Sequence, residues 1–232
     1  MLSRICIISS LCISVNLTEF PQVLSLAERF PHIYATVGVH PDYENEIEPS
    51  VDELIKLAQH PKLVGIGETG LDYFRLTGEL DWQRERFRRH IRAARAVKKP
   101  LIIHTRNAAA DTLRLMQEEN AAEVGGVLHC FTESLAVAEQ AIAMNFYISF
   151  SGIVTFKNAH ELKSIAQTIP LERMLIETDS PYLAPVPHRG KTNQPAYVKH
   201  VAEEIAKLRQ IPLSQVAAVT SANFFDLFKI KP

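Results

Sequence analysis

Cysteine is scarce in this chain, and no two cysteines have the spacing of a redox or zinc motif. The three thiols, Cys6, Cys12 and Cys130, form an odd set without a CxxC pair. This excludes a disulfide framework of the kind that stabilises small secreted domains. We therefore expect reduced thiols and a cytoplasmic location.

The sequence also lacks long apolar runs and an excess of either charge. No stretch approaches the ~18 apolar residues of a membrane span, so no membrane contact is expected. Lys and Arg number 25 against 26 Asp and Glu, for a net charge of -1. This balance argues against a protein that wraps duplex nucleic acid, but it is compatible with a locally basic groove. Glycine-rich nucleotide loops and the nucleophile elbow of serine hydrolases are absent as well.

Length and composition fit one globular domain. A chain of 232 residues, 47% apolar and 22% charged, can bury a core without disulfides and is too apolar for intrinsic disorder. We therefore expect a single domain over residues 1–232.

Short apolar, β-rich runs alternate with amphipathic segments, a pattern typical of βα units around a parallel sheet. The runs are nearly continuous in aliphatic and aromatic residues, as in strands that are covered on both faces. Strands are expected at residues 5–8 or 5–13, 33–39, 63–67, 101–104, 126–129, 146–150 and 174–177. Helices are expected at residues 19–29, 51–59, 79–98, 107–118, 135–144, 159–168, 196–210 and 213–228. The predicted fold is an α/β TIM-type (β/α)8 barrel with seven strands, one short of closure.

Acidic and imidazole side chains follow four of these strands. They are Glu68, His104, His129 and Asp179, with Glu177 beside the last of them. The C-terminal ends of parallel barrel strands meet at one rim, so we expect these side chains to converge there. Such a mixed nitrogen and oxygen donor set suits Zn, Mn or another divalent ion better than Ca. A divalent ion held there would activate water, so hydrolysis is the predicted chemistry.

Further polar residues are candidates for contacts with a substrate. His40 follows the second predicted strand, and its position is equally consistent with substrate contact and with a supporting role. Arg106, after the fourth strand, is a candidate for anchoring a phosphate group. The same role is predicted for a proline-rich loop that carries His188, Arg189 and Lys191.

Other conspicuous side chains are expected to be structural. An arginine stripe recurs at helical spacing in the third predicted helix, and we expect it to be ion-paired on a solvated face. Its members are Arg84, Arg88, Arg92 and Arg95. In the same helix His90 is expected at the surface, and Cys130 is expected in the core.

Four motifs in this order and spacing resemble those of the TatD family of metal-dependent deoxyribonucleases. They are GETGLD at 67–72, IHTR at 103–106, LHCF at 128–131 and ETDSPYLAP at 177–185. Residues 186–194 are similar to the YcfH-like branch of the family. The resemblance runs from about residue 4 to the end of the chain. It implies a TIM-barrel hydrolase with one or two divalent metals that cleaves DNA or related phosphodiesters, often as a 3'-to-5' exonuclease.

The resemblance also implies roles for individual residues. Glu68 corresponds to a metal-bridging carboxylate, and His104 and His129 correspond to imidazole ligands. Asp179 corresponds to a metal ligand that also accepts a proton. Glu68 and Asp179 are therefore the expected catalytic residues, and DNA is the expected partner.

The sequence departs from the family at its start. Family members begin with a strand that carries His-x-His-x-x-Asp or a similar pattern, whereas no histidine precedes His32 here. The first βα unit is therefore expected to be missing. Its loss would remove roughly 6–12 kcal/mol of apolar burial, which predicts marginal stability or impaired activity. Two alternatives to a deoxyribonuclease stay open: a metal-dependent hydrolase of a carboxylic ester, amide or lactone, and an inactive remnant that acts as a binding protein.

Overall fold

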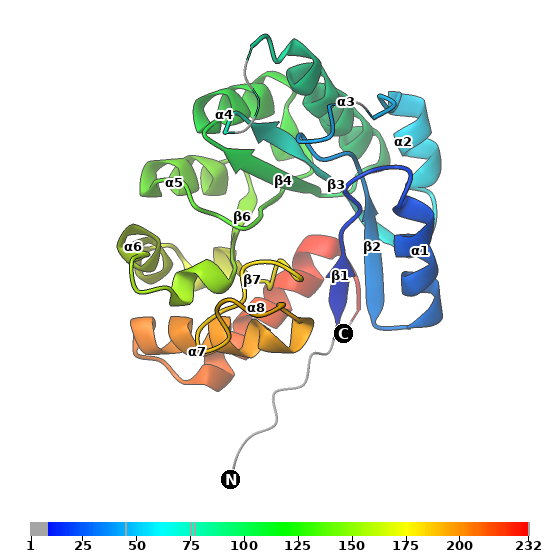
Figure 1. The fold of residues 1–232 in the computed structure, drawn as a ribbon. Coiled ribbons are helices and arrows are strands. Elements are labelled where there is room, and N and C mark those ends of the chain that lie inside the picture. The colour runs from blue at the N-terminus through cyan, green and yellow to red at the C-terminus, as the bar shows by residue number, and fades with distance from the viewer. Residues whose placement is uncertain (1–8, 45, 75, 77, 232) are drawn as a thin grey trace.

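One curled parallel sheet organises the part of the chain that the computed structural model describes, residues 9–44, 46–74, 76 and 78–231 (Figure 1). Seven strands pair in sequence order, so each connection returns to the neighbouring position in the sheet. They are β1 (Ser10–Cys12), β2 (Ile33–Val37), β3 (Leu63–Asp72), β4 (Leu101–Arg106), β5 (Gly126–Leu128), β6 (Phe146–Phe150) and β7 (Met174–Ile176). The prediction of a seven-stranded α/β fold of TIM type is confirmed. The strand predicted at 5–8 lies outside the described residues.

Helices follow the strands and pack around the outside of the curled sheet (Figure 1). They are α1 (Phe20–Arg29), α2 (Val51–Leu57), α3 (Asp81–Val97), α4 (Ala109–Glu118), α5 (Leu135–Ala143), α6 (His160–Thr168), α7 (Val198–Arg209) and α8 (Leu213–Phe228). Each lies within or close to the range that the sequence predicts. Among the described residues, every helix falls short of the length and apolarity needed to cross a bilayer.

A small apolar cluster fills the inner side of the sheet, apart from the larger core between sheet and helices. It takes one side chain from every strand and closes with the end of α8. Its members include Leu11, Tyr34, Val64, Ile102, Val127, Tyr147, Leu175, Leu227 and Phe228. Side chains two residues apart share a face of a strand. Ile102 and Val127 are therefore followed at the rim by His104 and His129, on the same face.

The arginine stripe of α3 is ion-paired, as predicted, but mostly with residues beyond its own helix. Arg84 pairs with Asp81 of its own helix at 2.8 Å, whereas the other three arginines have partners on α4 or on the segment that follows it. The closest of these pairs are Arg88–Glu118 at 2.7 Å, Arg92–Glu119 at 2.7 Å and Arg95–Glu123 at 2.8 Å. The stripe therefore joins two helices of the outer layer.

His90 lies in the core, and the prediction that places it at the surface is wrong. The side chain is fully buried on the inner face of α3. Its Nε2 accepts a hydrogen bond from the backbone N–H of Val39 at 3.0 Å, and its Nδ1 lies 2.8 Å from the carbonyl oxygen of Arg86. Nδ1 is therefore the protonated nitrogen of a neutral ring, and burial lowers the pKa of His90 to about 4.

This neutral histidine predicts a loss of stability in acid. At pH values between 6.5, the ordinary pKa of a histidine, and about 4, the pKa of His90 in the folded chain, the unfolded chain binds a proton at His90 and the folded chain does not. The free energy of unfolding should therefore fall by about 3 kcal/mol from this group as the pH drops from 7 to 4. Urea unfolding at several pH values would measure the slope. A His90→Gln variant should show a flatter slope, and identical slopes would contradict the assignment.

Candidate metal centre

Glu68 lies in β3 among three imidazole rings. Only 6% of the residue is exposed. Its Oε1 lies 2.7 Å from Nε2 of His129, 3.1 Å from Nε2 of His40 and 3.4 Å from Nδ1 of His104. The histidines come from the ends of β2, β4 and β5. The fold thus brings three of the four predicted ligands into contact and places His40 beside them.

The fourth predicted ligand, Asp179, follows β7 and lies beyond His129. Nδ1 of His129 lies 3.3 Å from Oε1 of Glu177. Within each of two groups, the atoms available as metal ligands lie within 4.8 Å of one another: His40, Glu68 and His104 in one, and His129, Glu177 and Asp179 in the other. The contact between Glu68 and His129 joins the two groups into one continuous cluster.

Close pairing of β3 with β4 positions the Glu68 side of this cluster. Gly70 pairs with His104 in the sheet, and a Cβ at Gly70 would lie 1.9 Å from the carbonyl oxygen of His104. Only glycine permits this approach. It brings Oδ2 of Asp72 to 2.9 Å from Nε2 of His104. A carboxylate behind an imidazole fixes the orientation of the ring and so prepares its other nitrogen to bind a metal.

Cys130 lies beside the site, and its predicted place in the core is wrong. The alternation of side chains ends after β5 because Cys130 adopts a left-handed φ of 45°. Its Sγ then lies 3.2 Å from Oγ of Ser151 and 4.0 Å from Oδ2 of Asp179. The thiol forms part of the wall around Asp179.

The charges in the cluster strongly perturb one another. Burial alone would raise the pKa of Glu68, but the charge of His129 and the hydrogen bonds from the three histidines hold it well below its usual range. Burial alone would lower the pKa of His129, yet Glu68 and Glu177 raise it well above. Burial raises the pKa of Asp179 to about 6. The negative charge of Glu177 acts in the same direction, and the positive charge of His129 opposes both. The carboxylates therefore stabilise positive charge at this position.

This donor set fits a divalent cation. Three imidazoles and three carboxylates face one another, and each of the six side chains is at least partly buried. Mixed nitrogen and oxygen ligands suit Zn, Mn and related ions, whereas Ca prefers oxygen alone. The residues present thus support a bound divalent metal.

The cationic residues predicted to contact substrate lie in two segments of the chain. Arg106, at the end of β4, places its guanidinium carbon 3.7 Å from the ring centroid of Phe74. The predicted phosphate loop packs on two other aromatic rings. There His188 stacks on Tyr197 at 3.9 Å, Arg189 lies over Phe156 at 4.0 Å, and Lys191 is exposed.

Sequence reasoning missed the part that Asp72 plays. It lies in the GETGLD motif without an assigned role, although a signal was available. Glu68, Gly70 and Asp72 recur at the two-residue period of one strand face. A strand that continues through the motif, as β3 does, places Asp72 on the same side as Glu68.

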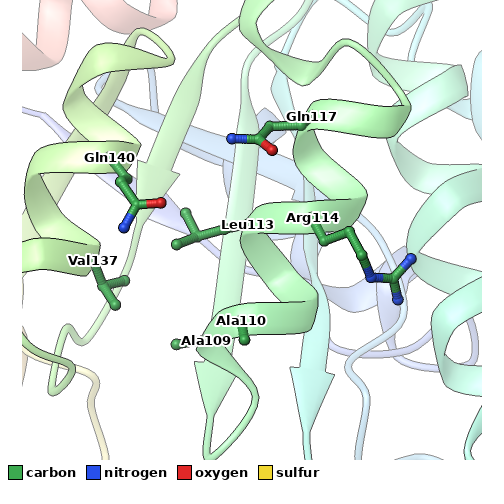
Figure 2. Close-up of a pocket in the computed structure, with 7 residues that line it drawn as sticks. All are labelled: Ala109, Ala110, Leu113, Arg114, Gln117, Val137 and Gln140. Carbon is green, nitrogen blue, oxygen red and sulfur yellow. The ribbon is translucent and has the colours of Figure 1, made fainter.

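A shallow groove between α4 and α5 lies outside this cluster. Figure 2 shows its lining residues, Ala109, Ala110, Leu113, Arg114, Gln117, Val137 and Gln140. Arg114 is the one titratable side chain in this lining, and it is paired with Asp111 at 2.9 Å and Glu118 at 2.7 Å. The groove therefore offers no acid–base or metal chemistry.

Comparison with known proteins identifies the family to which this chain belongs. The family model described as "TatD related DNase" matches residues 6–229. The chain belongs to the TatD family. Membership makes it a metal-dependent hydrolase, in agreement with the donor set at the rim.

Relatives within the TatD family cover most of the chain. An uncharacterized metal-dependent hydrolase, YcfH of Escherichia coli K12, is 46% identical over 220 residues, which span 95% of this chain and 83% of that protein. A 3'-5' ssDNA/RNA exonuclease, TatD of Salmonella typhimurium, is 36% identical and covers 93% and 85% of the two chains.

The fold agrees with a solved TatD homologue. The crystal structure of YjjV from Escherichia coli K12 superposes with a TM-score of 0.90 at 25% identity, over 97% of this chain and 88% of that one. An organophosphorus hydrolase from Deinococcus radiodurans shares the fold with a TM-score of 0.62 at 16% identity. The curled, TIM-like α/β fold of this chain is therefore that of a TatD homologue.

Proposed function

We propose that this chain is a divalent-metal-dependent deoxyribonuclease that removes nucleotides from the 3' end of DNA. The observation that carries the proposal is the contact of Glu68 with three imidazoles, which joins two potential ligand groups into one cluster beside Asp179. A pair of adjacent cation positions is suited to phosphodiester hydrolysis, where attacking and leaving oxygens both need stabilisation. The name of the Salmonella relative points to the same reaction.

The residues that would hold one or two ions are the six of the cluster: His40, Glu68, His104, His129, Glu177 and Asp179. A divalent ion bound there lowers the pKa of water and polarises a phosphoryl oxygen. The carboxylate of Asp72 holds His104 in the orientation that this binding needs. The apolar cluster that contains Ile102 and Val127 packs below His104 and His129 on the same face of the sheet.

Asp179 is the proposed proton acceptor. Its carboxylate accepts a proton from the water that attacks phosphorus, a P–O ester bond breaks, and the leaving oxygen takes a proton from solvent. Arg106 donates hydrogen bonds to a non-bridging phosphate oxygen, a pairing for which guanidinium geometry is suited. His40 lies next to the same position and can contact the substrate from the β2 side.

The loop that carries His188, Arg189 and Lys191 is proposed to contact phosphates further along the strand. The stacks on Tyr197 and Phe156 fix its backbone while Lys191 stays exposed. In this proposal, Arg106 and the loop contact different phosphates of the same substrate strand.

Hydrolysis of single-stranded DNA tests the proposal. Protein stripped of metal and then supplied with Mg, Mn or Zn should shorten a 5'-labelled oligonucleotide stepwise from its 3' end, and a chelator should stop the reaction. An oligonucleotide with a blocked 3' end is the control. Release of product from carboxylic esters, amides or lactones but not from any phosphodiester would replace the proposal with acyl hydrolysis. Metal-independent DNA binding without turnover would favour a binding protein.

A further inference from the structure

Large exposed apolar side chains gather at the rim that carries the metal cluster. Among the described residues, six such side chains are exposed: Leu26, Phe30, Ile47, Phe74, Tyr182 and Val186. The last four lie in loops that follow β2, β3 and β7. Single exposed apolar residues are common on proteins. Here, however, two of them are aromatic rings within a few residues of candidate metal ligands, Phe74 at 55% exposure and Tyr182 at 71%.

Phe74 is tied directly to the cluster through its backbone. Its N–H donates to Oδ1 of Asp72 at 2.8 Å, and the other oxygen of Asp72 contacts Nε2 of His104 at 2.9 Å. The guanidinium of Arg106 lies over the ring at 3.7 Å. With 55% of the residue exposed, the ring also keeps surface that is open to solvent beside this cation. The ring therefore offers a flat apolar surface next to a cation.

Tyr182 projects from a fixed turn on the β7 side of the cluster. Its N–H donates to the carbonyl oxygen of Asp179 at 2.9 Å. The buried amide of Asn193 donates to the carbonyl oxygens of Thr178 and Tyr182, at 2.7 Å and 2.6 Å. These bonds hold the backbone on both sides of Asp179, while the ring stays in solvent. An exposed ring on a fixed backbone loses little entropy when it binds a flat ligand.

We propose that Phe74 and Tyr182 are base-stacking residues, which hold unpaired nucleobases on the β3 and β7 sides of the scissile phosphate. This inference rests on the proposed function and adds to it the residues that bind the nucleobases. Every base has a π-face, so such stacking is independent of sequence. Bases inside a duplex are already stacked on one another, so rings at these positions favour a frayed or single-stranded end.

Binding of matched oligonucleotides tests this role without requiring turnover. The probes are a fluorescent phosphorothioate oligothymidylate and the same chain with abasic residues at its 3' end, titrated into the metal-loaded protein. Phe74→Ala and Tyr182→Ala should each weaken binding of the base-containing probe about tenfold. Binding of the abasic probe should not change. Phe74→Trp and Tyr182→Phe, which keep a ring, should retain wild-type affinity.

Phe30→Ala is the matched control, because Phe30 is an exposed ring with Arg29 at 5.6 Å and precedes β2, at the end of the strand opposite to the rim. It should bind both probes like the wild type. The inference is overturned if either alanine variant binds both probes like the wild type, or loses affinity for both equally. It is also overturned if the wild type does not distinguish the probes. Absence of phosphodiester hydrolysis together with base-dependent binding would instead remove the proposed function and leave this inference standing.

Discussion

Glutamine in place of Glu68 is expected to lower kcat/KM for DNA hydrolysis by at least about a hundredfold and to reduce the bound metal. Loss of a residue that merely supports a metal ligand costs about 10–100-fold, and Glu68 touches three imidazoles itself. The amide is neutral, so it provides no charge for a cation. Steady-state kinetics with metal analysis of the purified variant would measure both effects.

Asp72→Asn is the comparison for this variant, since Asp72 contacts the cluster only through His104. It should lose about 10–100-fold in activity and keep more metal than Glu68→Gln. Thermal unfolding of both variants shows whether either change disrupts the fold. Wild-type metal content and activity in Glu68→Gln would remove Glu68 from the metal site.

The strands and their order could be predicted because their residues alone favour buried parallel strands. The five residues of β6 are all buried and match the predicted range of 146–150. The prediction fails at β3, which continues through Asp72 where the apolar run ends at 67. Residues 68–72 are Glu, Thr, Gly, Leu and Asp, which do not form a continuous apolar run. Their pairing with β4, up to Asp72 opposite Arg106, keeps them extended.

The convergence of Glu68, His104 and His129 could be predicted because the ends of neighbouring parallel strands lie at one rim. The surroundings of these side chains depend instead on side-chain packing. His90 shows the difference. It lies on the same helical face as Phe87, Ile91 and Ala94, all fully buried, so helical periodicity was a sufficient signal for burial. Cys130 offered no such signal, because its side chain faces Asp179 only through a left-handed φ. The roles of Arg106, His40 and the 188–191 loop stay predictions that substrate binding must test.

Asparagine in place of Asp179 should lower kcat by about 10²–10⁴-fold, the usual contribution of a group that accepts a proton in the transition state. Asp179 adopts a left-handed φ of 57°, and asparagine is one of the few residues that tolerate this conformation. The substitution should therefore leave the turn and its bond to Tyr182 intact while it removes the charge. Single-turnover measurements at saturating metal would separate slow chemistry from weak metal binding.

Cys130→Ser is the matched control, because Cys130 also has a left-handed φ and lies 4.0 Å from Oδ2 of Asp179. Serine keeps a small polar group there, so activity should stay within a few-fold of the wild type. If Asp179→Asn keeps its metal but loses turnover, the carboxylate acts as the proton acceptor; if it loses both equally, the carboxylate acts as a ligand. Wild-type turnover in Asp179→Asn would mean that proton transfer belongs to another carboxylate of the cluster, and Glu177, whose Oε1 lies 3.3 Å from His129, would be the next to substitute.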